Sequence, residues 1–247
     1  MGLAPLAAIS RALPLSSALL GFGLLLGLES SAAAQLLRER PGTSIAFEAK
    51  VGPYLPDIAK EGTSAVWDAV YGDDRTRALV MLGFDFQMLR GDAGTLSLGV
   101  HAGFVHWDGG VTTDDGTSIE TSFDVVPLTL TLGYRFDALV DYTWLPIAPY
   151  VRGGYAHYVY WNEGPPLGEA GAGIDGNGSK SGLTATAGLA VALDGFDPLA
   201  AAQLADQTGI ATTYLFFEGQ MAWVDGFGDG GIDLSDTTWF GGLMLEL

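Results

Sequence analysis

The sequence predicts an all-β fold, an eight-stranded antiparallel up-and-down β-barrel. Three observations predict it: the period of the apolar residues, the lengths of the links and the placement of the aromatic side chains. In residues 94–107, GTLSLGVHAGFVHW, leucine and valine alternate with threonine, serine, glycine and histidine. Such alternation indicates a strand with one apolar face and one polar or small face. The eight segments of this kind lie at about 43–54, 78–89, 94–107, 119–136, 147–161, 181–194, 212–224 and 237–247.

The composition indicates a barrel that is transmembrane. The chain has 247 residues, no cysteine and a net charge of −18, yet its mean hydropathy is +0.27. The lack of cysteine excludes a disulfide framework and any cysteine metal site, and the negative charge argues against nucleic acid, which needs a basic patch. After the N-terminal region no stretch is apolar enough for a spanning helix. Only a closed barrel could then satisfy the backbone in lipid.

The N-terminus predicts export. Residues 13–28, LPLSSALLGFGLLLGL, follow Arg11 and have the length of a signal-peptide core. The alternative, a membrane anchor, would need roughly 20 apolar residues. Small residues in SSAAAQ predict cleavage after Ala34. The predicted domains are therefore a signal peptide, residues 1–34, and a barrel, residues 35–247.

The links between the segments alternate in length. Residues 90–93 and 137–146 are fairly short, whereas the links after strands one, three, five and seven are mostly longer and rich in Gly, Asp, Ser and Thr. Outer-membrane barrels have this pattern, with short periplasmic turns and long surface loops. The link 196–209, FDPLAAAQLADQTG, is the exception. Asp197 as N-cap and Pro198 as the first helical residue predict one short periplasmic helix there, ending at the glycine.

Aromatic side chains are expected to mark the two faces of the membrane, because belts of aromatic residues form at both interfaces. By strand parity, outward-facing aromatic residues fall at two heights, which a soluble sandwich gives no reason to expect. The predicted girdle consists of Phe86, Tyr134 and Phe136 at the inner ends of strands and Trp161, Trp223 and Trp239 at the outer ends. The leucine-rich face of each strand should therefore point to lipid.

The polar face of the strands is predicted to fill the lumen, because an eight-stranded barrel is just wide enough for side chains. The acids lie on strands one, two, seven and eight, and two arginines lie on strands four and five. Buried charges are costly unless they are paired, so we expect a salt-bridged plug. Its predicted members are Glu48, Lys50, Asp85, Gln87, His101, Arg135, Arg152, Glu218, Gln220 and Glu246.

The chain resembles the small outer-membrane β-barrels of Gram-negative bacteria in its cleavable signal, its eight amphipathic strands and its last strand, FGGLMLEL. FEAKVGPYLPDI, TSFDVVPLTLTLGYRFD, PYVRGGYAHYVYW and TTYLFFEGQMA resemble, more narrowly, an uncharacterised outer-membrane barrel family known chiefly from myxobacteria. The resemblance implies the fold and an outer-membrane location, with the barrel-assembly machinery recognising the last strand. It implies no catalytic or ligand residues. Leu247 stands where such strands typically close on phenylalanine.

The predicted function is structural or surface-interacting: a porin-like monomer with a closed lumen, among outer-membrane lipids and lipopolysaccharide, with no cofactor and no enzymatic activity. Alternatives are a narrow channel for small solutes or ions, a lipid-modifying barrel enzyme, and a secreted lipocalin-like barrel with its apolar face inside. Buried Tyr150, Tyr158, Phe216 and Phe240 would oppose a pore. His106 and His157 should face outward, without an acid–serine pair at a telling spacing. DGNGS (175–179) and DGFGDGGIDL (225–234) only half resemble calcium loops.

Overall fold

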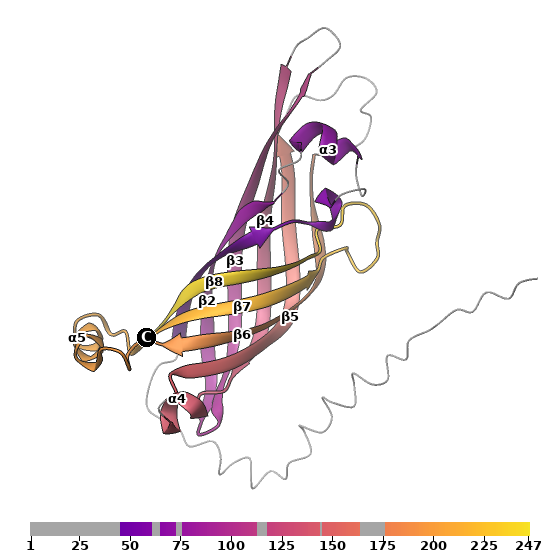
Figure 1. The fold of residues 1–247 in the computed structure, drawn as a ribbon. Helices are drawn as coiled ribbons and strands as arrows, with labels where there is room; N and C mark the ends of the chain where they lie inside the picture. Colours follow the sequence, from indigo (N-terminus) through magenta and orange to yellow (C-terminus); the bar gives the residue numbers. More distant parts are fainter. Residues whose placement is uncertain (1–44, 61–64, 73–75, 113–117, 144, 164–175) are drawn as a thin grey trace, which may run out of the picture. The chain divides into compact units, whose positions relative to one another are not determined.

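Alternating apolar and polar residues form the wall of a closed barrel. The computed structural model describes residues 45–60, 65–72, 76–112, 118–143, 145–163 and 176–247. Within them, eight strands pair in chain order and the last returns to the first (Figure 1). The predicted signal peptide and its cleavage site at Ala34 lie outside these residues. The predicted fold class, an up-and-down antiparallel barrel, is confirmed.

The strands overlap all eight predicted segments. They are β1 Ile45–Tyr54, β2 Arg77–Gly91, β3 Gly94–Thr112, β4 Ser118–Arg135, β5 Ile147–Glu163, β6 Asn177–Ala192, β7 Thr212–Trp223 and β8 Asp236–Glu246. Antiparallel pairing of β1 with β8, from Ala46↔Glu246 to Val51↔Gly241, closes the wall. β3 continues five residues beyond the predicted end at Trp107, a continuation that was not predicted because its last residues, DGGVT, carry no apolar period.

The two ends of the barrel differ. At the turn end, β2 and β3 meet at Asp92 and Ala93, α4 (Ala138–Tyr142) joins β4 to β5, and α5 (Pro198–Thr208) joins β6 to β7. At the loop end, η1 (Asp57–Ala59) and α3 (Ala65–Tyr71) follow β1. Of these helices only α5 was predicted, because the others are too short to show a helical period. No helix of the described residues is both long and apolar enough to cross a membrane.

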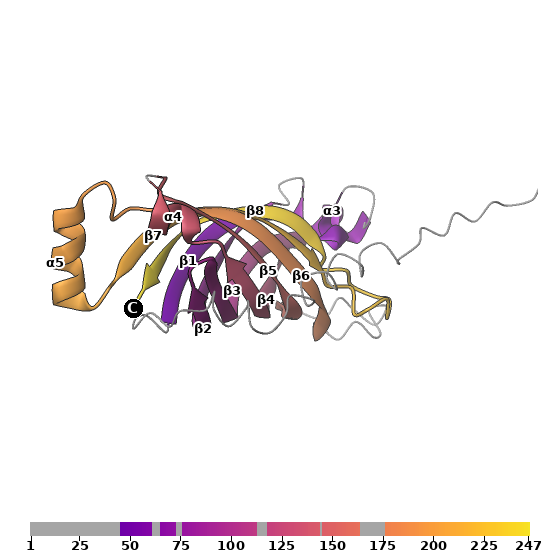
Figure 2. The ribbon, with the colours of Figure 1, turned by 90° about the horizontal axis from the view of Figure 1, so that it is seen from below.

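α5 begins and ends at the predicted residues. The side chain of Asp197 accepts a hydrogen bond from the backbone N–H of Ala200 at 3.0 Å, which caps the first turn. Gly209 ends the helix with a φ of 79°, a left-handed conformation that glycine adopts without steric cost. Figures 1 and 2 both show α5 standing apart from the strands, beside the C-terminus.

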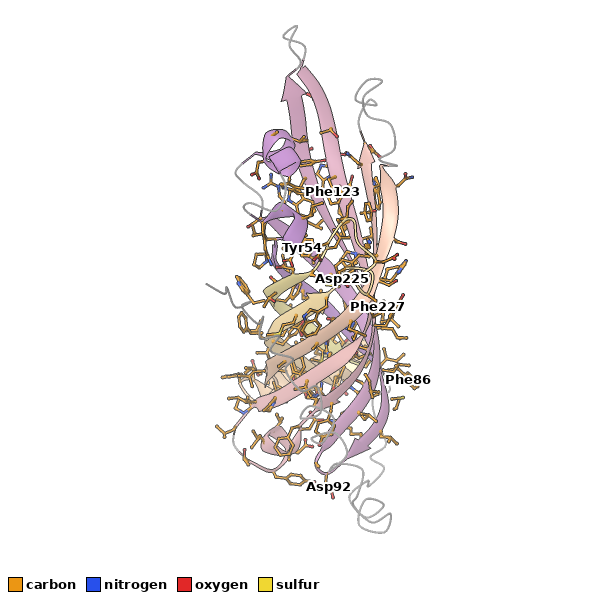
Figure 3. The ribbon with its side chains drawn as sticks, turned by 90° about the vertical axis from the view of Figure 1, so that its right-hand side faces the viewer. Tyr54, Phe86, Asp92, Phe123, Asp225 and Phe227 are labelled. Carbon is orange, nitrogen blue, oxygen red and sulfur yellow. The ribbon has the colours of Figure 1, made fainter. Side chains whose placement is uncertain are left out.

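The apolar face of the strands is the outer surface. Leu98, Leu130 and Leu189 are 40%, 49% and 52% exposed, whereas Arg135 and Arg152 are buried in the lumen. This orientation confirms the prediction and rules out the lipocalin-like alternative, whose apolar face would line the interior. The girdle residues Phe86, Tyr134, Phe136, Trp223 and Trp239 are exposed, and Trp161 is half-buried near Phe104. Figure 3 shows Phe86 on the outer wall toward the turn end.

Two apolar clusters fill much of the lumen. The cluster at the loop end includes Tyr54, Trp107, Phe123, Tyr158 and Phe240, with Trp67 of α3 packed against it. The cluster toward the turn end includes Ala46, Tyr150, Tyr214, Phe216 and Met244. Charged side chains lie around this second cluster. The interior is thus occupied by side chains, as expected for eight strands.

Replacing Gly83 with alanine should destabilise the barrel. A Cβ at Gly83 would overlap the imidazole of His101, whereas a Cβ at Gly219 on the outer wall would have nothing within 4 Å. Overpacking of this kind typically costs about 1–3 kcal/mol. Urea unfolding of the refolded protein, followed by intrinsic fluorescence, should show the loss for Gly83→Ala and none for Gly219→Ala. Equal unfolding midpoints for the two variants would contradict the tight packing of His101.

Candidate functional site: the charged lumen and the outer wall

Arg152 on β5 joins three acidic strands across the lumen. Its guanidinium donates to both carboxylate oxygens of Glu48 on β1, with 2.8 Å between Nη1 and Oε2. Its Nη2 lies 3.0 Å from Oδ2 of Asp85 on β2, and its Nη1 lies 3.8 Å from Oε2 of Glu218 on β7. All four side chains are buried. The two-pronged contact with Glu48 is the strong geometry for an arginine–carboxylate pair.

Glu218 has a second set of partners. Lys50 donates from Nζ to Oε1 of Glu218 at 2.5 Å, and Tyr150 donates from Oη to Oε2 at 2.6 Å. The ammonium of Lys50 also lies 4.9 Å from the centre of the Phe240 ring. A carboxylate with no exposed surface thus receives both a cation and a neutral donor, which offsets the cost of its burial.

Arg135 organises the charges near the turn end. It donates from Nη2 to Glu246 and from Nε to Oδ1 of Asp137, the latter at 2.5 Å. Thr95 donates to the other oxygen of Asp137 at 2.5 Å, and Gln87 donates to Glu246 at 2.6 Å. Asp137 is not among the predicted members of the plug, because it lies just beyond β4, in the expected link. Its position two residues after Arg135 is the only signal that the sequence offers.

His101 faces the carboxylates that Arg152 binds. Its Nε2 lies 3.5 Å from Oε2 of Glu48 and 3.9 Å from Oδ1 of Asp85. A histidine and two carboxylates this close are a possible ligand set for a metal ion. Here the guanidinium of Arg152 already binds both carboxylates, so a metal cation would meet a fixed positive charge. The arrangement is that of an ion-pair network. The remaining predicted member of the plug, Gln220 on β7, is also buried.

The lumen leaves little open space near these charges. A cavity of about 20 Å³ lies beside Asp85, Gln87 and Arg135. A cavity of that size has room for about one water. The bulky residues expected to oppose a pore, Tyr150, Tyr158, Phe216 and Phe240, are all buried.

At the loop end, η1 and α3 lie over the aromatic cluster. The ring of Trp67 lies 5.7 Å from that of Trp107 and 5.2 Å from that of Phe123. Burial raises the pKa of Tyr71 on α3. The hydrogen bond from Lys60 to Asp57 raises the pKa of the Lys60 ammonium. α3 thus adds packed aromatic rings over the lumen, and Ile58 and Ala59 of η1 pack against the same cluster.

The two outward histidines both have partners. His106 lies between two acids, with Nδ1 2.7 Å from Oδ1 of Asp124 and Nε2 2.8 Å from Oδ1 of Asp108. His157 lies with Nδ1 3.0 Å from Oγ of Ser181. The sequence offers no acid–serine pair at a telling spacing from His157, and the structure brings its imidazole to a serine that lies 24 residues away along the chain. The contact arises from the pairing of β5 with β6, which spacing along the chain does not reveal.

The β7–β8 loop contains the segment that half resembles a calcium repeat. Lys180 donates from its ammonium to the backbone carbonyl of Gly230, so the chain supplies its own cation to this loop. Asp233 accepts a hydrogen bond from the backbone N–H of Ser235 at 2.9 Å. The other calcium-like segment begins at Asp175, which lies outside the described residues.

These features define a closed eight-stranded antiparallel barrel with an apolar exterior and a charged, packed lumen. Among solved structures, the outer membrane protein OprG from Pseudomonas aeruginosa is similar, with 12% identity, a TM-score of 0.52 and coverage of 83% of this chain and 97% of that chain. This likeness shows the fold. No family model matches the chain, and no curated protein matches its sequence.

Two further solved structures are similar with lower TM-scores. Neisserial surface protein A (NspA) has 11% identity, a TM-score of 0.45 and coverage of 84% of this chain and 100% of that chain. Ail, the attachment invasion locus protein of Yersinia pestis, in complex with the heparin analogue sucrose octasulfate, has 15% identity, a TM-score of 0.40 and coverage of 83% and 97%.

Removing the Arg152 cation should destabilise the barrel strongly. Arg152→Met leaves Glu48 and Asp85 buried without their shared partner, and breaking a buried ion pair costs about 3–5 kcal/mol. Lys60→Met, at the exposed pair with Asp57, should cost no more than about 1 kcal/mol. Urea unfolding of the refolded variants measures both. The double variant Glu48→Gln, Arg152→Met should recover part of the loss, since it also removes one buried negative charge. A double variant that is no more stable than Arg152→Met would contradict this.

Proposed function

We propose that the chain is a monomeric integral protein of the outer membrane of a Gram-negative cell. The observation that carries the proposal is the inverted polarity of the barrel: Phe84, Leu130 and Phe217 are exposed, while Glu48 and Glu218 are fully buried. Soluble proteins rarely expose an apolar surface of this extent, whereas a barrel in a membrane turns such a surface toward lipid. Strands of 10 to 19 residues are long enough to span a bilayer.

The proposed orientation follows from the two ends. Apart from the link that contains α5, the connections at the turn end are shorter than most of those at the loop end. The turn end is therefore placed in the periplasm and the loop end at the cell surface, as is usual for such barrels. Outer-membrane lipids and lipopolysaccharide then surround the wall, and the assembly machinery inserts it. The narrower resemblance, to a barrel family known chiefly from myxobacteria, stays a prediction.

The proposed role is structural or surface-interacting, with a closed lumen. Ion pairs through Arg135 and Arg152 cross the interior, and aromatic rings pack above them. Solutes would have to break these pairs to pass. The wall would hold the protein in lipid, and the loop end would present a surface to the outside.

Membrane location can be tested by fractionation and by a wall substitution. The expressed protein should appear in the outer-membrane fraction and migrate differently on gels before and after heating. Leu130→Arg places a charge on the lipid-facing wall and should cost about 2–4 kcal/mol if this height is near the midplane. Gln203→Arg, at an exposed position of α5, should change stability by less than about 0.5 kcal/mol. A wholly soluble protein would overturn the proposal.

The closed lumen can be tested by electrical recording. Purified protein in planar bilayers should give no single-channel steps, because the buried ion pairs and rings leave room for about one water beside Asp85. Well-resolved, reproducible steps from protein whose folding is verified on gels would favour the narrow-channel alternative. Vesicles without protein provide the background.

A further inference from the structure

Three polar side chains interrupt the apolar outer wall. Tyr155 and His157 on β5 and Ser181 on β6 alternate with lumen-facing residues such as Ala156 and Tyr158, which are buried. Tyr155 is exposed, and the other two are half-buried. They form a connected chain: Tyr155 donates from Oη to Oγ of Ser181 at 2.7 Å, and Oγ lies 3.0 Å from Nδ1 of His157.

The contact has the geometry of a nucleophile beside a general base. A serine hydroxyl is a weak nucleophile until a neighbouring base can take its proton. In the tautomer whose Nδ1 accepts, the hydroxyl of Ser181 donates to His157, and 3.0 Å is within reach for proton transfer. His157 pairs with Ser181 in the ladder between β5 and β6, so the wall itself holds the two side chains together.

The pair lies at the height of the outer membrane interface. From Ala192 at the turn end of β6, a strand rising about 3.3 Å per residue at a tilt of about 40° climbs roughly 25–28 Å to Ser181. The apolar band of such barrels is about 25 Å tall. Girdle residues flank the pair: Trp161 lies farther along β5, and Trp223 pairs with Leu183 on β6. Acyl ester groups of lipids lie at this boundary.

The β7–β8 loop begins beside Ser181. The backbone N–H of Gly226 donates to the carbonyl of Ser181 at 3.0 Å. The next residue, Phe227, has a φ of 58° and is 66% exposed. Left-handed backbone is costly for a bulky residue, and such strain collects at functional sites. In Figure 3, Asp225 and Phe227 lie well below the far end of the β3–β4 hairpin, so the β7–β8 loop is lower than that hairpin.

We propose that Ser181 and His157 form a lipid-edge site that hydrolyses a long-chain acyl ester of an outer-leaflet lipid. The inference rests on the proposed membrane location. Oγ of Ser181 attacks the ester carbonyl carbon while Nδ1 of His157 takes the hydroxyl proton. The bond to the alcohol oxygen breaks, and that oxygen receives the proton from His157. Water, deprotonated by the same imidazole, then cleaves the acyl-serine, releasing a fatty acid and restoring the serine hydroxyl.

The test uses the full barrel refolded into two sets of vesicles, one of diacyl glycerophospholipids alone and one that also contains lipopolysaccharide. Mass spectrometry measures released fatty acid, and a fluorophosphonate probe followed by peptide mapping locates a reactive serine. The wild type should release fatty acid and carry the probe on Ser181. Ser181→Ala and His157→Gln should each lower release by about 100-fold or more. The vesicle set that yields fatty acid identifies the class of lipid.

The matched controls are Ser179→Ala, an exposed serine on the same strand, and His106→Gln, the other outward histidine. Both should release fatty acid at the wild-type rate. If inserted, heat-modifiable wild type releases none from either vesicle set and takes no probe on Ser181, the inference is wrong while the outer-membrane proposal stands. Release by Ser181→Ala at the wild-type rate would also overturn it. A chain that does not insert at all overturns both proposals.

Discussion

Closure of β1 on β8 is the constraint on which the rest of the structure depends. Once the ladder is closed, one face of every strand looks into a lumen only wide enough for side chains. Charges placed there cannot reach bulk water, so each must find a partner across the interior. Arg152 meets this condition by binding Glu48 and Asp85 together. The small residue at Gly83 leaves the space that the ring of His101 takes up.

The same closure also determines what the exterior can do. Neighbouring strands are hydrogen-bonded over most of their length, so outward side chains on adjacent strands lie in a fixed register. The hydroxyl of Ser181 and the imidazole of His157 meet in this way, although they lie on different strands. A rigid wall is a favourable support for paired functional groups, because strands hold side chains more precisely than loops do. In one sheet, the inward side chains therefore pair across the lumen, while the outward side chains on adjacent strands are held in register on the wall.

Much of the fold can be predicted from the sequence because strand periodicity is a local property. Parity alone shows that Leu130 and Arg135 look in opposite directions. The partner that a side chain finds on another strand cannot be predicted from parity, because it depends on the register between strands and on the stagger of the closed barrel. That is why the contact of His157 with Ser181 was missed. Asp137 was missed for another reason, because it lies just beyond the end of β4. The short helices α3 and α4 were not predicted, because a helix of five to seven residues is too short to show a helical period in the sequence.

The rim of the barrel is uneven: the β3–β4 hairpin rises far beyond the strands that carry the low β7–β8 loop. In the proposed orientation, the tall side and the low side of the rim would be reached by different kinds of molecule. A particle arriving from the medium, such as a phage tail or an antibody, would touch the tall hairpin first. A molecule diffusing sideways within the leaflet would encounter only the low side, where Phe227 stands at the edge. The uneven height of the rim would thus give particles from the medium and molecules within the leaflet different contact surfaces.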